Sequence, residues 1–173
     1  MSIKHYFMKL KAYFLILILF AVVNSSFTQQ SDSHPSFMKF KFSFLDNFKY
    51  PSELKDRGIS TITLMLVKFN NDGTVKEIKF SDSALQQFVD EIHRVKDKIE
   101  FKYIYNDVTK IDKEARVVLI PIQIDVEKTG ISGHLPQIME ADQQNLYNFS
   151  GKPVSGNYHI YPMLYILSVK LSR

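Results

Sequence analysis

The sequence predicts an α+β domain: a small antiparallel sheet of about four to five strands, with one long amphipathic helix packed on one face and a short helix before the central strand. Two segments, 59–69 and 115–127, are rich in β-branched and aliphatic residues. A turn sequence at 71–73 follows the first of them, and the segment 83–99 carries apolar residues at helical spacing. Strands joined by a tight turn and crossed by an amphipathic helix are typical of this class.

Composition fits a single globular domain and excludes several classes of protein. The chain has 173 residues, of which 45% are hydrophobic and 23% charged. It has no cysteine, so disulfides, thiolate zinc sites and cysteine nucleophiles are excluded. Three of its 22 basic residues, Lys4, Lys9 and Lys11, lie near the N-terminus, and the remaining 19 nearly balance 18 acidic residues. We therefore expect no nucleic-acid partner.

The first 28 residues have the three-part layout of a secretory signal peptide. Residues 1–11 carry three lysines, residues 12–23 are uninterrupted apolar, and residues 24–30 are small and polar. The apolar run has 12 residues, whereas a helix needs roughly 20 to cross the hydrocarbon core. The sequence predicts cleavage near residue 28, a periplasmic or secreted protein, and no stable membrane span afterwards. An uncleaved signal anchor is the alternative, because no clear A-x-A cleavage site follows.

Residues 29–49 are expected to form a polar leader followed by a strand. The segment 37–45, FMKFKFSFL, alternates apolar residues with lysine and serine. A period of two indicates a strand with one buried face. The residues expected on that face are Met38, Phe40, Phe42 and Phe44.

A short helix and a hairpin are expected next. Pro51 suits a first helical turn and Gly58 a helix end, which predicts a helix over 51–57. The segment 59–69 is apolar on both faces, as in a central strand. The turn at 71–73, Asn-Asp-Gly, leads into a second strand over 74–80.

The long helix is expected to begin after a cap at Ser81, Asp82 or Ser83 and to end near Ile99. Its apolar stripe comprises Leu85, Phe88, Val89, Ile92, Val95 and Ile99. We interpret 101–105 as a short extended piece and 106–114 as a polar loop.

Two further strands complete the predicted sheet. In the segment 115–127, strict alternation of apolar residues indicates a strand, and Pro121 places it at a sheet edge or beside a bulge. A last strand is expected within 158–171.

The run from residue 50 to 124, about 75 of 173 positions, resembles the C-terminal domain of TonB energy-transducer proteins. The resemblance lies in the order and spacing of several short features. They are Tyr50-Pro51, Gly58-Ile59, Asn71-Asp72-Gly73 with Thr74-Val75, Ser83 before the helix, Phe101, and the strand 118–124 with Pro121-Ile122. The resemblance implies a domain over 50–127, followed by a C-terminal extension over 128–173.

In that family the edge of the last strand receives an extended segment of an outer-membrane receptor, which adds a strand to the sheet. The resemblance therefore implies an envelope or outer-membrane partner that binds by strand addition. The expected partner-binding residues are Val118, Ile120, Ile122, Ile124 and Val126 on this edge, with Tyr103 and Tyr105 as exposed aromatic contacts. A C-terminal strand over 158–171 could instead occupy the same edge and block docking. The chain also departs from a transducer because its apolar run is short and no proline-rich spacer follows.

Catalytic and metal-binding patterns are weak. Ser52-Glu53-Leu54-Lys55, Ser81-Asp82-Ser83 and Lys128-Thr129-Gly130 echo the elements of penicillin-binding serine enzymes. The third residue of the middle motif differs, however, and the chain has no room for the helical domain of those enzymes. The histidines show no metal-binding spacing. We expect no metal, no cofactor and no catalytic site.

The function that the sequence favours is an exported, non-catalytic protein-interaction module of the cell envelope. The alternative is a structural or self-associating envelope protein, such as a homodimer joined through a sheet edge. A hydrolase that uses Ser52 or a carboxylate is a third hypothesis.

Overall fold

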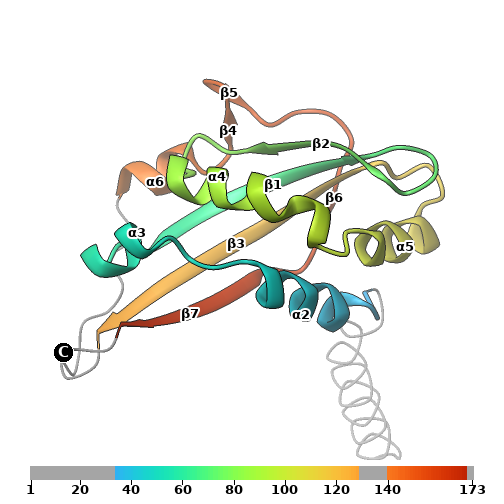
Figure 1. Ribbon diagram of the computed structural model, residues 1–173. Helices are drawn as coiled ribbons and strands as arrows, with labels where there is room; N and C mark the ends of the chain where they lie inside the picture. The colour runs from blue at the N-terminus through green and yellow to red at the C-terminus, as the bar shows by residue number, and fades with distance from the viewer. Residues whose placement is uncertain (1–33, 129–139, 171–173) are drawn as a thin grey trace, which may run out of the picture. The chain divides into compact units, whose positions relative to one another are not determined.

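The computed structural model describes residues 34–128 and 140–170, which belong to one compact unit spanning residues 34–173. The fold is α+β, as predicted, with helices beside a five-stranded sheet and a separate two-stranded sheet (Figure 1). The expected signal peptide at 1–28 lies outside the described residues, as do the polar leader up to residue 33 and part of the C-terminal extension.

The centre of the sheet confirms three predicted strands. β1 (Thr61–Phe69) forms an antiparallel hairpin with β2 (Val75–Phe80), and on its other side it pairs antiparallel with β3 (Val117–Lys128). Gly73 adopts a φ of +84° in the hairpin turn, a conformation that favours glycine. The strand order is therefore β2-β1-β3, with β1 in the middle.

The last predicted strand is present, but in two pieces that run parallel to β3. β6 (His159–Ile160) pairs with Val118 and Leu119, and β7 (Leu164–Lys170) pairs with residues 122–128. The sheet is mixed rather than wholly antiparallel. A second sheet consists of the short strands β4 (Asn148–Phe149) and β5 (Lys152–Pro153), and α6 (Glu140–Asn145) precedes it.

The first described element corrects a prediction, because the expected strand at 37–45 is the helix α2 (Phe37–Asn47). Phe40 and Phe44, four residues apart, are fully buried, whereas Met38 is 50% and Phe42 is 56% exposed. The alternation of phenylalanine with lysine also contains the i,i+4 spacing of a helix. Packing of Phe40 against Phe101 selects the helical spacing.

The short helix α3 (Ser52–Arg57) is confirmed. It ends at Gly58, which has a φ of +70° and donates its N–H to Leu54 and Lys55. The Tyr50 hydroxyl donates a hydrogen bond of 2.8 Å to the Ile59 carbonyl and so fixes the chain where β1 begins.

The predicted single long helix is wrong in its bounds. α4 (Gln86–Val95) begins three residues later, and a 3-10 turn, η1 (Lys96–Lys98), follows it. Ser81 and Ser83 do not cap the helix, because their hydroxyls bond to each other at 2.9 Å in a buried cluster with Thr63. The apolar stripe is correct: Phe88, Ile92, Val95 and Ile99 are buried, and Leu85 and Val89 pack against them.

The segment expected as an extended piece and polar loop is the helix α5 (Lys102–Ile111). Ile104 and Val108, four residues apart, are fully buried and face the sheet with the rest of the core. Burial of this face stabilises a helix despite the polar residues on its other side.

All three longer helices, α2, α4 and α5, cover one face of the sheet (Figure 1). That face carries Met65, Val67, Ile120, Ile122 and Leu164, which form one core with the helices. On the opposite face, residues between Phe149 and Asn157 lie beside Leu66, Lys68 and Val117. No helix among the described residues is long and apolar enough to cross a membrane.

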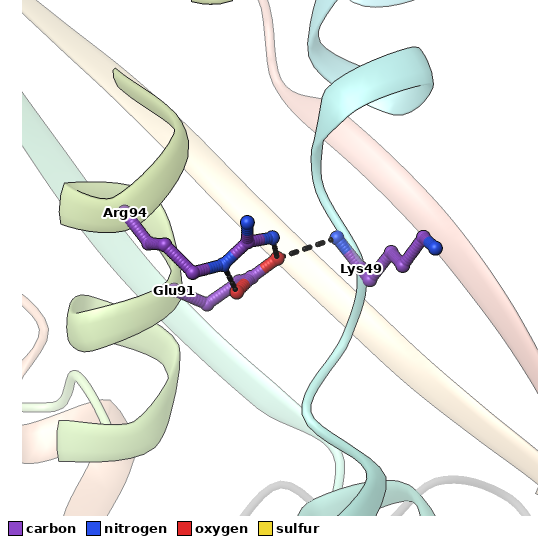
Figure 2. Close-up of polar contacts among 3 residues, drawn as sticks. All are labelled: Lys49, Glu91 and Arg94. Atoms are coloured by element: carbon purple, nitrogen blue, oxygen red, sulfur yellow. Dashed lines mark hydrogen bonds and ion pairs between the residues drawn. The ribbon is translucent and has the colours of Figure 1, made fainter. Parts of the chain in front are cut away.

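A carboxylate joins α4 to the connection between α2 and α3 (Figure 2). Glu91 accepts two hydrogen bonds of 2.7 Å from the guanidinium of Arg94 and one of 3.1 Å from the backbone N–H of Lys49. The hydrogen bonds from Arg94 hold the pKa of Glu91 below its usual value. This arrangement ties the α2–α3 connection to the helical layer.

Candidate protein-interaction surface

The strand predicted as the open sheet edge is in fact a central strand. β3 pairs with β1 on one side and with β6 and β7 on the other. Val118, Ile120, Ile122 and Ile124 are all 0% exposed, because they face the helical layer. Val126 is half-buried, and its N–H donates to Ser60 Oγ at 3.0 Å. The prediction that residues 118–126 form an exposed edge is therefore wrong.

Pro121 is compatible with this central position because it lies where the neighbouring strand is interrupted. Leu64 lies opposite Pro121, and both of its backbone groups bond to Ser81 on the β2 side. The Leu64 N–H donates to Ser81 Oγ, and the Leu64 carbonyl accepts from the Ser81 N–H. The nitrogen of Pro121 therefore faces the other neighbour, where β6 has ended at Ile160 and β7 has not yet begun at Leu164. A proline can occupy a central strand when no donor is required from it.

The two tyrosines predicted as exposed contacts are bound within the domain. The Tyr105 hydroxyl donates to the Asn71 carbonyl at 2.7 Å, and its ring packs against Phe69 and Gly73. The Tyr103 ring packs against the core and lies 5.8 Å from the ammonium group of Lys39. Both tyrosines lie on α5 and are half-buried, so neither is the free aromatic contact that was expected.

The strand β7 provides the open edge that β3 lacks. Its even-numbered residues have backbone groups directed at β3, which leaves the N–H and C=O groups of Tyr165, Leu167 and Val169 directed outward. No other strand in the described part of the chain pairs with this side of β7. The same three side chains lie on the face opposite the helices and are 45%, 51% and 39% exposed. We call these three residues the β7 stripe.

The outer edge of β7 lacks two of the usual protections of an edge strand. Residues 164–169 include no charged residue and no proline, both of which natural proteins use to prevent edge pairing. The interaction of the Tyr165 hydroxyl with the carboxylate of Asp125 raises the pKa of this tyrosine above its usual value. Only at the end of the strand does a charge appear, where the Lys170 ammonium group bonds to the Asp56 carbonyl of α3.

Comparisons with known proteins give no match. No family model, no curated protein and no solved structure matches the chain. The resemblance to the TonB C-terminal domain therefore stays a prediction from the residues named above.

A buried carboxylate holds the C-terminal strands in place. Asp107, on α5, is 0% exposed and accepts hydrogen bonds from the Tyr161 hydroxyl at 3.0 Å and from the Ser36 N–H at 2.9 Å. Tyr161 lies between β6 and β7, and burial together with the nearby carboxylate of Asp107 raises its pKa above the usual value. This contact joins three distant segments: the start of α2, α5 and the β6–β7 junction.

Sequence reasoning missed this contact because it interpreted residues 106–114 as a solvated loop. The i,i+4 pair of Ile104 and Val108 could have identified a helix with Asp107 on its buried side.

Among the described residues, the catalytic and metal candidates do not assemble into a reactive site, and Thr129 and Gly130 of the third motif lie outside the described residues. Ser81 Oγ is buried and lies 2.9 Å from the hydroxyls of Thr63 and Ser83, and no histidine or carboxylate in the described part of the chain bonds to it. Ser52 begins α3. Within residues 34–128 and 140–170, no three acidic or histidine side chains are grouped as a metal ion would require.

Proposed function

We propose that the chain is an exported, non-catalytic protein-interaction module of the cell envelope that binds an extended segment of a partner protein along the outer edge of β7. The observation that carries this proposal is the β7 stripe, an uncharged edge whose N–H and C=O groups have no strand partner among the described residues. Such an edge accepts a guest strand by the same hydrogen bonds that join strands within a sheet.

The proposal differs in one respect from what the resemblance to the TonB family implies. In that family the guest adds to the last strand of the hairpin-helix-strand unit, which corresponds here to β3. That side of β3 is occupied by β6 and β7 of the same chain. The guest position therefore moves one strand outward, to β7.

The chemistry of the edge sets the kind of guest that would bind. Tyr165, Leu167 and Val169 offer three N–H and three C=O groups, and each hydrogen bond contributes about 0.5–1.5 kcal/mol net. Alternate side chains of the guest would lie on the same face as the β7 stripe and bury apolar surface against it. The preferred guest is an extended segment with apolar residues at alternate positions and no proline at its pairing donors.

The test is site-specific crosslinking in the envelope of the producing cell. A photoreactive residue placed at Tyr165 should form an adduct with an envelope protein, whereas the same residue at Tyr147, which is 61% exposed on a different segment, should not. Leu167→Lys should abolish the adduct, because it places a charge on the edge. Ile111→Lys is the matched control, since Ile111 is 52% exposed and Leu167 is 51% exposed.

A second variant addresses the backbone directly. Leu167→Pro removes an N–H that points away from β3, so the strand should stay folded while pairing with a guest is blocked. An adduct of unchanged yield in Leu167→Pro, or no adduct at Tyr165 at all, would contradict the proposal.

The export step has its own test. Intact mass of the protein from the periplasmic fraction should show the loss of residues 1 to about 28. A full-length species that stays with the inner membrane would instead support an uncleaved signal anchor.

Pairing of two copies is the second candidate function, and the β7 stripe itself favours it. An antiparallel pair centred on Leu167 would place Tyr165 opposite Val169 with no like charges between them. Sedimentation equilibrium distinguishes the two candidates, because a dimer that dissociates in Leu167→Pro supports self-association and a monomer supports a separate partner.

A further inference from the structure

A pocket lies on the side of the sheet opposite the helices, away from β7. It has a volume of about 400 Å³, which falls within the usual range for small-molecule sites. One wall comes from the sheet, with Leu66 and Lys68 on β1, Lys79 on β2 and Val117 on β3. The other wall comes from Phe149 to Asn157, on and after the β4–β5 hairpin, which Figure 1 shows beyond β2.

The hairpin that forms this second wall is fixed to the sheet. The carboxylate of Asp82, just after β2, accepts hydrogen bonds from the N–H groups of Ser150 and Gly151 at 2.8 and 2.7 Å. The N–H of Asp82 donates to the Asn148 carbonyl at 2.7 Å. Ser150 and Gly151 have φ of +54° and +74°, so a tight turn presents both amides to one carboxylate. The pocket therefore has two walls that are joined by specific contacts.

The charged residues that line the pocket are all positive. Three lysines line it, Lys68, Lys79 and Lys152, and no carboxylate is among the lining residues. Glu77, beside the pocket, is shared between Lys68 and Lys79, with both N–O distances 2.8 Å. Its hydrogen bonds with these two lysines lower its pKa to about 2, as a carboxylate between two cations requires. Lys152 makes no ion pair with any described residue, which leaves two positive charges uncompensated.

Neutral donors add to the positive side chains. The Val154 N–H donates a hydrogen bond to the Tyr147 carbonyl. The N–H groups of the next three residues, Ser155, Gly156 and Asn157, donate to no residue in the part of the chain that the structure describes. Gly156 has a φ of +99° and nothing within 4 Å of the position of a Cβ. Backbone amides in such a turn can bind an anion together with lysine side chains.

The remaining surface of the pocket is apolar. Leu66, Val117 and Phe149 are half-buried and would cover a hydrocarbon or aromatic group. A bare inorganic anion would leave this surface exposed to water, whereas a neutral ligand would leave the lysines without a counter-charge.

We propose that this pocket binds a small organic anion, with its carboxylate, phosphate or sulfonate group on the lysines and its apolar body on Leu66, Val117 and Phe149. This site is independent of the β7 edge and shares no residue with it. Lys152 is the lysine whose charge is available to the ligand, because Glu77 already neutralises part of the charge on the other two.

The test uses 1-anilinonaphthalene-8-sulfonate, which has an apolar body and a sulfonate, and N-phenyl-1-naphthylamine, which has the same body without the charge. Fluorescence titration of the full-length protein should show that the sulfonate probe binds at least about tenfold more tightly than the neutral probe. One strong contact between a sulfonate and a lysine accounts for a difference of this size. Lys152→Gln should weaken sulfonate binding about fivefold to tenfold and leave the neutral probe unchanged. Lys98→Gln, at an exposed lysine of η1 on the helical side, is the control and should change neither.

Two further measurements keep the outcome clear. Amide chemical shifts should move at Leu66, Val117 and Phe149 when the sulfonate is added. Displacement by 1-naphthoate and by 1-naphthyl phosphate then shows which anionic group is preferred. Equal affinity for both probes, insensitivity to Lys152→Gln, or shift changes confined to the β7 stripe would overturn the proposal.

Discussion

The replacement Tyr161→Phe tests the contact that holds the C-terminal strands against the domain. The Tyr161 side chain is 1% exposed, and its hydroxyl donates to the carboxylate of Asp107, which is 0% exposed. Phenylalanine keeps the ring and its edge contacts with Phe37 and Phe40 but removes the donor. The variant therefore isolates one hydrogen bond to a buried charge.

The expected cost follows from the surroundings of Asp107. After the replacement, the carboxylate keeps only the Ser36 N–H at 2.9 Å, because its Oδ1 atom has no hydrogen-bond partner in the described part of the chain. Hydrogen bonds to charged groups contribute about 1.5–3 kcal/mol, and a buried charge that loses a donor lies near the upper end. We expect Tyr161→Phe to lower the free energy of unfolding by about 2–3 kcal/mol.

Urea unfolding followed by circular dichroism measures this loss. Tyr50→Phe is the matched control, because the Tyr50 hydroxyl donates to the neutral carbonyl of Ile59 at 2.8 Å, and it should cost only about 1 kcal/mol. If Tyr161→Phe costs no more than Tyr50→Phe, the buried hydrogen bond from Tyr161 to Asp107 is no stronger than one to a neutral carbonyl, and the reasoning is refuted.

Three further outcomes are expected from the same structure. Burial raises the pKa values of Tyr50 and Tyr161 above the usual 10. Folding therefore favours their neutral forms, and the stability they contribute should be complete below pH 10 and decline as the pH rises further, which unfolding at pH 8 to 11.5 can measure. Gly73→Ala should lower stability by about 1–2 kcal/mol in thermal unfolding, because φ is +84° and the new Cβ would lie 2.7 Å from the Tyr105 ring. Leu167→Lys should change stability by less than about 0.5 kcal/mol, because this side chain is 51% exposed in the absence of a partner.

The sequence predicts the centre of the fold well, because local signals and tertiary packing agree there. The turn at 71–73 and the glycine at position 58 each impose a backbone conformation that few other residues adopt. The apolar residues from Leu85 to Ile99 recur only at helical spacing and do not also alternate as in a strand. In these segments, no competing structure buries the same residues.

The failures occur where one apolar pattern fits two structures. In α2, phenylalanines recur both at alternate positions and four residues apart, and contact with Phe101 decides between a strand and a helix. Ser81 is a good helix cap by type, but the buried hydroxyls of Thr63 and Ser83 use it instead. Such decisions depend on residues distant in the sequence.

The candidate site could be predicted only in part. Pro121 suggested an edge, yet the missing donor faces the gap between β6 and β7, which periodicity does not reveal. The predicted strand over 158–171 contains β7, which pairs with β3 and forms the open edge of the sheet. The sequence also indicated that such a strand would block docking on β3.

Amide hydrogen exchange along β7 tests the central claim most directly, namely that β7 covers β3 and leaves its own outer edge open. The amides of Ile166 and Ser168 face β3 and should exchange slowly, whereas those of Tyr165, Leu167 and Val169 should exchange quickly in the free protein. Fast exchange at all five amides would show that β3 has an open edge after all. Slow exchange at all five would show that the outer edge of β7 is already covered.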